Sequence, residues 1–496
     1  MKPQITKWRV GLLCFVMVYV GFLLIELGYK SILWDESVHF IGGLLLSRGD
    51  IWQWIWTNSF YPPVFDSITA FYFLINGSAS VFAARLVAVT FAALSAFVIY
   101  FIAEKMYGPK TAIISAIFFG VMPGIVWASR MAMIETLLIF VFSLLILFFY
   151  KWLGSDREKD RIIFTAIIVI GVAIKYQMLV LAPIIVIAGM IFWKREFLKK
   201  EAISYFIAPR LKFTIILISI AAIVSAAILL SGILDIWFFA IQTGTQDKAA
   251  YSIRYPQPIY YFFEMTWISS EIHPISPLLY GVGLAGLGLF AFRQKKEDKL
   301  LLLWFIVVYL VFTIIPNREW RYVTTLFPVL AISAANALTT GACELQKIWQ
   351  IVKNSSTRKV LAKIGAVFLI ALTIGGVALS CVDSYNWISS DHTNIPTDQA
   401  VNYLEPKLCE NQTVMVACPL NQFNSYMVWF YLNQKTPHPS NNVTQYPKLA
   451  VDAYTPDFNI SECIYICEQN NTKFVLLYEH AEATTYFETT FNMQQA

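Results

Sequence analysis

The stretch that decides the fold is Val10–Tyr29, VGLLCFVMVYVGFLLIELGY, followed closely by Trp34-Asp35-Glu36-Ser37-Val38-His39. A helical run of about twenty apolar residues suffices to cross the ~30 Å hydrocarbon core of a bilayer. Ionised carboxylates are costly inside hydrocarbon, so we expect Asp35 and Glu36 at the membrane interface or in a wet cavity. The plainer alternative is a hydrated loop that happens to be acidic.

The loop between this span and the next, residues 30–79, carries more aromatic and charged residues than a connector needs. It contains His39, Arg48, a tryptophan cluster at 52, 54 and 56, and Tyr61-Pro62-Pro63. Trp and Tyr anchor chains at membrane interfaces, and a loop of about fifty residues is usually functional or disordered. We therefore expect this loop to carry function.

The composition sets the class of protein. The chain is 57% hydrophobic and 14% charged, with a mean hydropathy of +0.59, which excludes an ordinary soluble globule. Lys and Arg exceed Asp and Glu only slightly, 37 to 32, and form no basic stripe that would indicate nucleic-acid binding. The basic start, Lys2 to Arg9, precedes a long apolar run without a clear small-x-small cleavage site, which we interpret as an uncleaved first span.

Apolar runs predict a polytopic α-helical membrane protein with about eleven spans. The fifth and sixth runs are short and meet at Lys175-Tyr176-Gln177. The sequence leaves open whether these spans are tilted, broken or incomplete. The predicted runs are 10–29, 80–103, 111–129, 132–150, 162–174, 178–193, 213–233, 277–292, 299–315, 322–340 and 364–381.

The placement of Lys and Arg predicts the orientation. With the N-terminus inside, the basic segments 105–110, 151–161, 194–212, 293–299 and 347–363 all fall on the cytoplasmic side. This asymmetry agrees with the positive-inside rule, and an odd number of spans places the C-terminal tail outside. The chain then divides into a transmembrane domain, 1–381, and an exterior domain, 382–496.

The tail is polar and predicts a small α/β domain. Residues 397–404 form a capped helix pattern behind Pro396, and 414–417 and 473–478 are typical of buried strands. Residues 426–432 are consistent with a second helix between the strands.

Four of the seven cysteines lie in this tail, which suits an oxidising compartment and predicts two disulfides. Three connectivities are possible among Cys409, Cys418, Cys463 and Cys467. Zinc binding is the alternative for Cys463-x-x-x-Cys467, although no second pair has ligand spacing. Glycosylation sequons agree, weakly, with an exterior tail; they begin at Asn411, Asn442, Asn459 and Asn470.

A set of polar residues is expected near membrane level on the exterior side. Arg binds phosphate in a bidentate manner, Lys contributes a point charge, and a carboxylate can act as general base toward a hydroxyl. Such a set could take an anionic lipid headgroup and abstract a proton. Its members are Asp35, Glu36, His39, Tyr61, Arg85, Arg130, Glu135, Lys175, Arg321 and Tyr322.

Each of these residues also has a plainer interpretation. The side chain of Arg130 could simply place its charge at the membrane interface without binding a ligand. Arg85 and Glu135 could be structural ion-pair partners, and Lys175 could be an interface anchor. His39 lies four residues after Asp35 and would share its face in a helix; a plain hydrogen bond is favoured there over metal ligation. No Walker motif, Gly-rich phosphate loop or Ser–His–Asp pattern is present, so nothing supports nucleotide hydrolysis.

Over about residues 8–380, the chain resembles the polyprenyl-phosphate-sugar-dependent glycosyltransferases of the C type. The protein mannosyltransferase-like and lipid A aminoarabinose transferase-like enzymes are the most similar branches. The chain lacks the Trp-Trp-Asp-Tyr-Gly motif of oligosaccharyltransferases and the inserted β-trefoil domain of eukaryotic protein mannosyltransferases. It has Tyr61 where family members often have His before Pro-Pro. The motifs that carry the resemblance are Trp34-Asp35-Glu36, Tyr61-Pro62-Pro63, Ala84-Arg85-Leu86, Ser129 to Glu135, Ile174-Lys175-Tyr176, and Trp320-Arg321-Tyr322 followed by Pro328.

The resemblance implies a GT-C fold and transfer of a sugar, hexose or pentose, from a polyprenyl (dolichyl-type) phosphate to a hydroxyl of a protein, lipid or glycan. It implies that Asp35 is the general base, assisted by Glu36, and that Arg85, Lys175 and Arg321 hold the phosphate. Glu135 would line the cavity, and inversion at the anomeric carbon would follow from a single displacement on the exterior face.

The resemblance implies no required cofactor, although a divalent cation is possible. The expected location is the plasma membrane. A transporter or lipid flippase is the main alternative function, although no inverted pair of hydrophobic halves is present, and a scaffold or receptor is the third.

Overall fold

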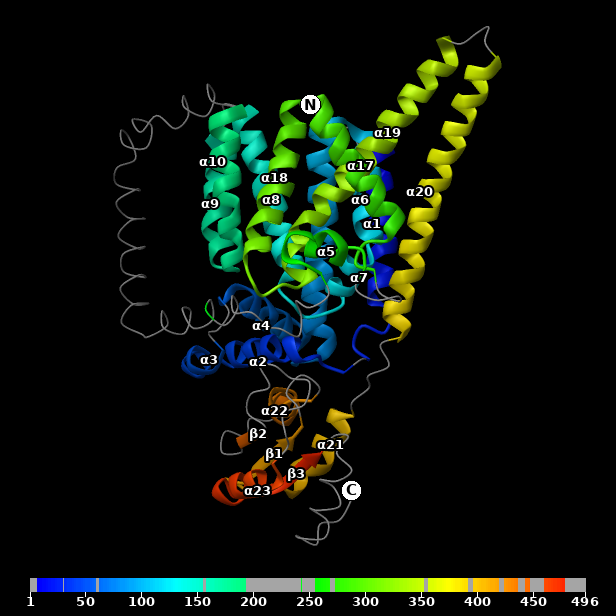
Figure 1. The fold of residues 1–496 in the computed structure, drawn as a ribbon. Helices are drawn as coiled ribbons and strands as arrows, with labels where there is room; N and C mark the ends of the chain where they lie inside the picture. Colours follow the sequence, from blue (N-terminus) through cyan, green and yellow to red (C-terminus); the bar gives the residue numbers. More distant parts are fainter. Residues whose placement is uncertain are drawn as a thin grey trace, which may run out of the picture.

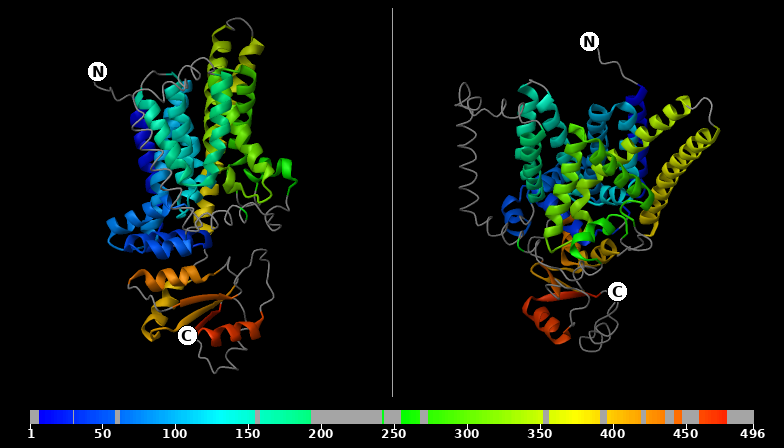
Figure 2. Two further views of the ribbon diagram at one scale, coloured as in Figure 1. Left: turned by 90° about the vertical axis from the view of Figure 1, so that its left-hand side faces the viewer. Right: turned by 45° about the horizontal axis from the view of Figure 1, so that its top comes forward.

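The computed structural model describes residues 7–29, 31–58, 62–154, 158–192, 242, 255–267, 273–351, 356–390, 396–418, 423–435, 442–446 and 459–477. A bundle of long helices forms the body of the molecule, with a layer of shorter helices across one end and a small α/β domain beyond that layer (Figure 1, Figure 2). The predicted span 213–233 and Tyr61 lie outside the described residues.

The bundle contains a helix for every predicted apolar run within the described residues. Its elements are α1 (Lys7–Leu24), α5 (Val81–Tyr107), α6 (Pro109–Val121), α7 (Pro123–Ser129), α8 (Glu135–Gly154), α9 (Glu158–Val172), η1 (Tyr176–Val180), α10 (Leu181–Phe192), η2 (Gln257–Ile259), α16 (Tyr260–Glu264), α17 (Pro277–Arg293), α18 (Lys296–Ile314), η3 (Trp320–Leu326), α19 (Phe327–Ile351) and α20 (Ser356–Ser390).

Within the described ranges, four helical stretches are long and apolar enough to cross a membrane: α1, α5, α8 and Trp320–Lys347. The α6–α7 pair makes a fifth if it is counted as one bent span. Shorter apolar helices add to the bundle at Gln177–Phe192 and Pro277–Arg293. The fold is therefore that of a multi-pass membrane protein, and the number of eleven spans stays a prediction.

Two predicted spans are interrupted for identifiable reasons. The third bends by 67° between α6 and α7, where Pro123 has no N–H to continue the helical ladder. The fifth and sixth runs are separate because α9 ends at Val172 and Lys175 is extended, with φ −160° and ψ 140°. Of the alternatives left open for this junction, a break between two helices is what the structure shows.

The described parts of the predicted cytoplasmic segments lie at one end of the bundle, and 194–212 lies outside the described residues (Figure 1). Arg9 near the N-terminus lies 3.5 Å from Glu104 at the end of α5. Arg293 pairs with Asp298 at 2.6 Å, and the hydroxyl of Tyr107 donates to the same carboxylate at 2.7 Å. The N-terminus is thus at one end, and the shorter helices and the C-terminal domain are at the other (Figure 1).

The first loop is not irregular; it folds into three helices, α2 (Trp34–Arg48), α3 (Ile51–Asn58) and α4 (Val64–Asn76). The α2 helix begins where the side chain of Glu36 accepts a hydrogen bond from the backbone N–H of its N-cap residue. It ends at Gly49, whose φ of 81° is in the left-handed region that glycine adopts without strain.

The C-terminal domain is built on a parallel three-stranded sheet of order β2-β1-β3. The predicted helices at 397–404 and 426–432 and the strands at 414–417 and 473–478 are confirmed, with small differences in their ends. The elements are α21 (Thr397–Leu404), η4 (Glu405–Lys407), β1 (Thr413–Ala417), α22 (Ser425–Gln434), β2 (Asn442–Tyr446), α23 (Ile460–Gln469) and β3 (Thr472–Leu477), of which β2 and α23 were not predicted.

The structure contradicts the two predicted disulfides, because all seven cysteines are free thiols. Cys463 and Cys467 are one turn apart on α23, where Cβ atoms lie about 5–6 Å apart, whereas a disulfide needs about 3.8 Å. Cys418 belongs to the apolar cluster on one face of the sheet and Cys463 to the cluster on the other. Cys409 and Cys418 lie at opposite ends of β1.

Candidate active site

Glu36, on the first turn of α2, is fully buried and saturated with hydrogen bonds. Its carboxylate accepts bonds from Arg85 Nε at 2.9 Å and Nη2 at 2.8 Å. It also accepts the backbone N–H of Ala132 at 2.7 Å and that of Leu33 at 2.9 Å. Because its oxygens are fully engaged, Glu36 fixes the start of α2 against α5 and the turn before α8.

Arg85 and Arg130 hold the connection between α1 and α2. Arg85 donates to the carbonyl oxygens of Leu27 at 3.1 Å and Ser31 at 2.8 Å, in addition to Glu36. Arg130 Nη1 lies 2.7 Å from the carbonyl oxygen of Leu23, at the C-terminal end of α1. A cation in this position satisfies helix carbonyls and opposes the negative end of the helix dipole.

Asp35 faces a different partner from Glu36. Its side chain is 33% exposed and accepts a hydrogen bond from Arg321 Nη1 at 2.6 Å. Arg321, on η3, also donates from Nη2 to Glu319 at 2.7 Å. Burial opposes ionisation of Asp35, but the charge and hydrogen bond of Arg321, together with the charge of Lys175, hold its pKa below the ordinary value. Asp35 is therefore a carboxylate at neutral pH.

Glu135 and Lys175 form a second buried ion pair beside Asp35. Glu135 is the first residue of α8, and Lys175 Nζ lies 3.4 Å from its Oε1. Glu135 Oε2 is buried and accepts no hydrogen bond from any residue that the structure describes. The charge of Lys175 acts on Asp35, and that of Glu135 acts on Arg321, so the two pairs form one cluster.

His39, one turn after Asp35 on α2, belongs to a buried polar group that sequence reasoning missed. Its Nδ1 lies 2.7 Å from Asp66 Oδ1 on α4. The other oxygen of Asp66 accepts the indole N–H of Trp54 on α3 at 2.8 Å. Asp66 thus ties all three helices of the first loop together. His39 is hydrogen-bonded to Asp66 and not to Asp35, whose helical face it was expected to share, and its predicted role in substrate binding stays a prediction.

Of the two predicted tyrosines, only Tyr322 belongs to the described residues. The hydroxyl of Tyr322 accepts a hydrogen bond from the side-chain amide of Asn317 at 3.1 Å, next to Arg321 in the chain. Tyr61 cannot be placed, since it lies outside the described ranges.

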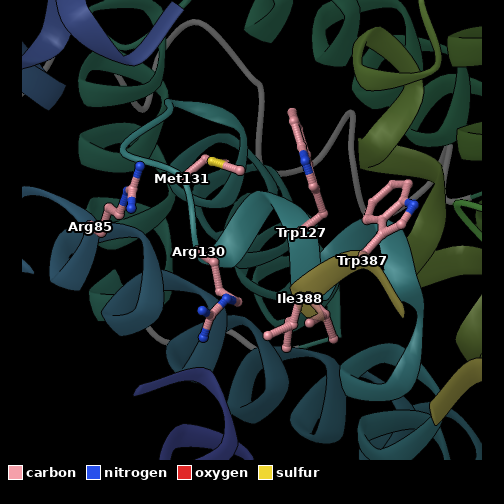
Figure 3. A pocket seen from close by; sticks show the side chains of 7 residues that line it. Arg85, Trp127, Arg130, Met131, Trp387 and Ile388 are labelled. Atoms are coloured by element: carbon pink, nitrogen blue, oxygen red, sulfur yellow. The ribbon is translucent and has the colours of Figure 1, made fainter. Parts of the chain in front are cut away.

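A small pocket is lined by residues of α5, of α7 and the turn that follows it, and of α20, among them Arg85 and Arg130. Figure 3 shows Trp127 and Trp387 on one side of it and Arg85 and Arg130 on the other. The Trp127 ring is also 5.8 Å from the guanidinium carbon of Arg321. Trp127 therefore contacts both the pocket and the cluster around Asp35.

The structure thus separates the predicted residues into two groups. Asp35, Arg321, Glu135 and Lys175 lie together, while Glu36, Arg85 and Arg130 hold the chain around them. In the described part of the chain, no three His, Cys, Asp or Glu side chains are grouped to hold a metal ion.

Asp66 and Glu319 are the participants that sequence reasoning did not select. Asp66 lies in the first turn of a helix that has no other charged residue. This isolated charge could have identified it as a candidate. Glu319 belongs to a charged stretch, Asn317-Arg318-Glu319, in which the sequence gives no reason to prefer one residue.

One known protein family matches part of the chain. Residues 61–225 match the family described as dolichyl-phosphate-mannose-protein mannosyltransferase. Comparison with curated protein sequences finds no match.

Several solved structures share the fold. ArnT from Cupriavidus metallidurans bound to undecaprenyl phosphate is 15% identical with a TM-score of 0.60, over 94% of this chain and 89% of that one. The Archaeoglobus fulgidus oligosaccharyltransferase tethered to an acceptor peptide is 13% identical with a TM-score of 0.61, over 95% and 69%. AglB from the same organism, in complex with an inhibitory peptide and dolichol-phosphate, is 11% identical with a TM-score of 0.52, over 94% and 69%. The chain therefore has the GT-C fold and is similar to membrane glycosyltransferases that use polyprenyl-phosphate carriers, as its sequence resemblance predicted.

Proposed function

We propose that this protein is an integral-membrane glycosyltransferase that moves a sugar from a polyprenyl-phosphate donor to a hydroxyl acceptor. The observation that carries the proposal is the placement of Asp35. It is a partly exposed, ionised carboxylate on the helix layer at one end of the bundle, beside Arg321 and close to Lys175. The family match and the shared fold support this function over transport.

The reaction assigns roles to three members of the cluster, Asp35, Arg321 and Lys175. Asp35 accepts the proton of the acceptor hydroxyl while the hydroxyl oxygen forms a bond to the anomeric carbon of the sugar. The bond from that carbon to the phosphate oxygen breaks, and the lipid phosphate leaves with the electron pair. Arg321 and Lys175 stabilise the departing phosphate. General-base help of this kind typically contributes ~10²–10⁴-fold in rate.

Arg321 links donor binding to the base. In the structure it is shared between Asp35 and Glu319. A donor phosphate would compete with Asp35 for this guanidinium, and Asp35 would become more basic as its hydrogen bond is lost. The predicted role of Arg85 in phosphate binding is less well supported, because its donors already serve Glu36 and two carbonyl oxygens.

The proposal includes a location and an orientation. The reaction would take place on the exterior face of the plasma membrane, with the N-terminus inside, because the described segments that are rich in Lys and Arg lie at the end of the bundle opposite to Asp35. The donor sugar would be a hexose or a pentose.

Transfer can be tested with the full chain in proteoliposomes. These are given polyprenyl phosphates carrying radiolabelled mannose, glucose or aminoarabinose, together with acceptors extracted from cells that lack the gene. We expect one donor to release lipid phosphate in step with label on an acceptor. Relocation of label across the bilayer without release would instead establish a transporter.

The Asp35→Asn variant tests the base. It should keep its melting temperature and donor affinity but lose most single-turnover transfer, by roughly 10²–10⁴-fold. If Asp35 only holds the loop in place, this variant would melt earlier and transfer at the normal rate per folded molecule.

A further inference from the structure

The C-terminal domain is packed directly on the helix that carries Asp35. Phe430 of α22 is fully buried. Its ring meets Phe40 of α2 edge to face at 4.9 Å, and it lies 6.4 Å from Phe73 of α4. Figure 2 shows α22 against the layer of first-loop helices.

The contact is part of a single apolar core and not a patch between two finished domains. One cluster of buried residues contains Phe40, Ile41 and Leu44 from α2 as well as Val414 from β1 and Phe430 from α22. The face of α2 opposite the cluster around Asp35 is therefore completed by the C-terminal domain. Without that domain, this face would expose apolar side chains to water.

Polar contacts fix the same interface at its edges. The guanidinium of Arg48, in the last turn of α2, donates to the backbone carbonyl of Asn433. The side-chain amide of Gln434 donates to the carbonyl of Ala79 at 2.5 Å, just before α5 begins. The end of α22 thus binds α2 and the start of the helix that carries Arg85.

The geometry points to a positioning role, and we propose that the C-terminal domain holds α2 so that Asp35 keeps its catalytic alignment, with Phe430 as the central positioning residue. This inference rests on the proposed function of Asp35. A rigid helix transmits a small rotation at Phe40 directly to a side chain five residues earlier, and a displacement of ~1 Å at a reacting group costs on the order of 10²-fold in rate.

The test compares two substitutions at one position with a matched control in the intact protein. Phe430→Ala removes the ring, and Phe430→Leu restores most of the apolar volume. Phe474→Ala removes a partly buried ring on β3, which belongs to the same domain but pairs with β1. Single-turnover rate, affinity for polyprenyl phosphate, melting temperature and backbone hydrogen exchange of residues 34–48 are measured for each variant.

We expect Phe430→Ala to slow transfer by roughly ten- to a hundred-fold, with unchanged affinity for polyprenyl phosphate and faster exchange in α2. Phe430→Leu should recover most of the rate, and Phe474→Ala should lower the melting temperature without slowing transfer. Arg48→Met, which removes the polar contact, should also slow transfer. If Phe430→Ala fails to fold, Phe430→Leu and Arg48→Met decide the question.

Two results would overturn the inference. One is a wild-type rate for Phe430→Ala or Arg48→Met in folded protein. The other is an equal loss of rate and stability in Phe430→Ala and Phe474→Ala, which would indicate a general structural effect. Absence of transfer by the wild-type protein would refute the proposed function instead, and the two failures are therefore distinguishable.

Discussion

At the scale of single residues, Asp35 and Glu36 are neighbours with opposite surroundings. Consecutive residues of an α-helix point about 100° apart, so Glu36 meets Arg85 and Asp35 meets Arg321. Both carboxylates were candidates in the sequence, and the family resemblance made Asp35 the base and Glu36 its helper, but the partner of neither could be predicted. Their partners are separated from them by 49 and 286 residues, and such distant pairings depend on the tertiary fold.

Glu36→Gln should destabilise the protein more than it harms the chemistry. It leaves the buried guanidinium of Arg85 without a counter-charge, and breaking a buried pair costs about 3–5 kcal/mol. Glu104→Gln is the control, since its partner Arg9 is 42% exposed and a surface pair contributes at most about 1 kcal/mol. Equal melting temperatures for the two variants in lipid nanodiscs would contradict the structural role of Glu36.

Arg321→Met should move the acid limb of the rate profile to higher pH. Asp35 acts as a base only when ionised, and Arg321 lowers its pKa. In the wild type, the rate should therefore fall only below the ordinary pKa of Asp; without Arg321 the pKa rises and the fall begins at higher pH. Rates at donor concentrations far below KM, which report the protein before the donor engages Arg321, measure this shift. Lys175→Met, which removes a weaker influence, should shift the limb less.

At the scale of elements, α2 and α4 approach closely because Gly43 has no side chain. A Cβ at this position would lie 2.6 Å from Cγ2 of Thr69 and 3.1 Å from Cε2 of Phe73. Close approach of the two helices is what places Asp66 within hydrogen-bonding distance of His39.

Gly43→Ala should therefore destabilise the protein, by about 1–3 kcal/mol, through overpacking. Adding Thr69→Ser removes the clashing methyl group and should restore part of the loss. Gly281→Ala is the control, because no atom lies within 4 Å of its added Cβ, and it should be neutral or stabilising by up to about 1 kcal/mol. Equal melting temperatures for Gly43→Ala and Gly281→Ala would show that α2 and α4 can separate without cost.

Elements were predictable from the sequence where one physical signal dominated. Apolar runs identified the bundle helices, but the first-loop helices were read as a loop. The α2 helix mixes apolar and polar residues, and α3 and α4 are too short to span a membrane. Gly49 and Gly77, both with positive φ at helix ends, were the stop signals that could have revealed them. The number of cysteines in the C-terminal domain could not predict disulfides, because it does not say which face of the sheet each thiol occupies.

At the scale of the whole molecule, the orientation in the membrane can be tested directly. Single cysteines are placed at exposed positions 442 and 347 in a background in which the exposed Cys14, Cys343, Cys381 and Cys409 are serine. A membrane-impermeant maleimide should label position 442 in intact cells and position 347 only after permeabilisation. The reverse pattern would overturn the proposed orientation and the exterior location of the reaction.

The apolar core shared by α2 and α22 also has a consequence for biosynthesis. Phe40 is translated well before Phe430, and domains generally fold in the order in which they are made. The outer face of α2 is therefore covered only after α22 has been synthesised. On this account, a nascent chain that stops before α22 can insert its first helices into the membrane, but the apolar face of α2 stays exposed.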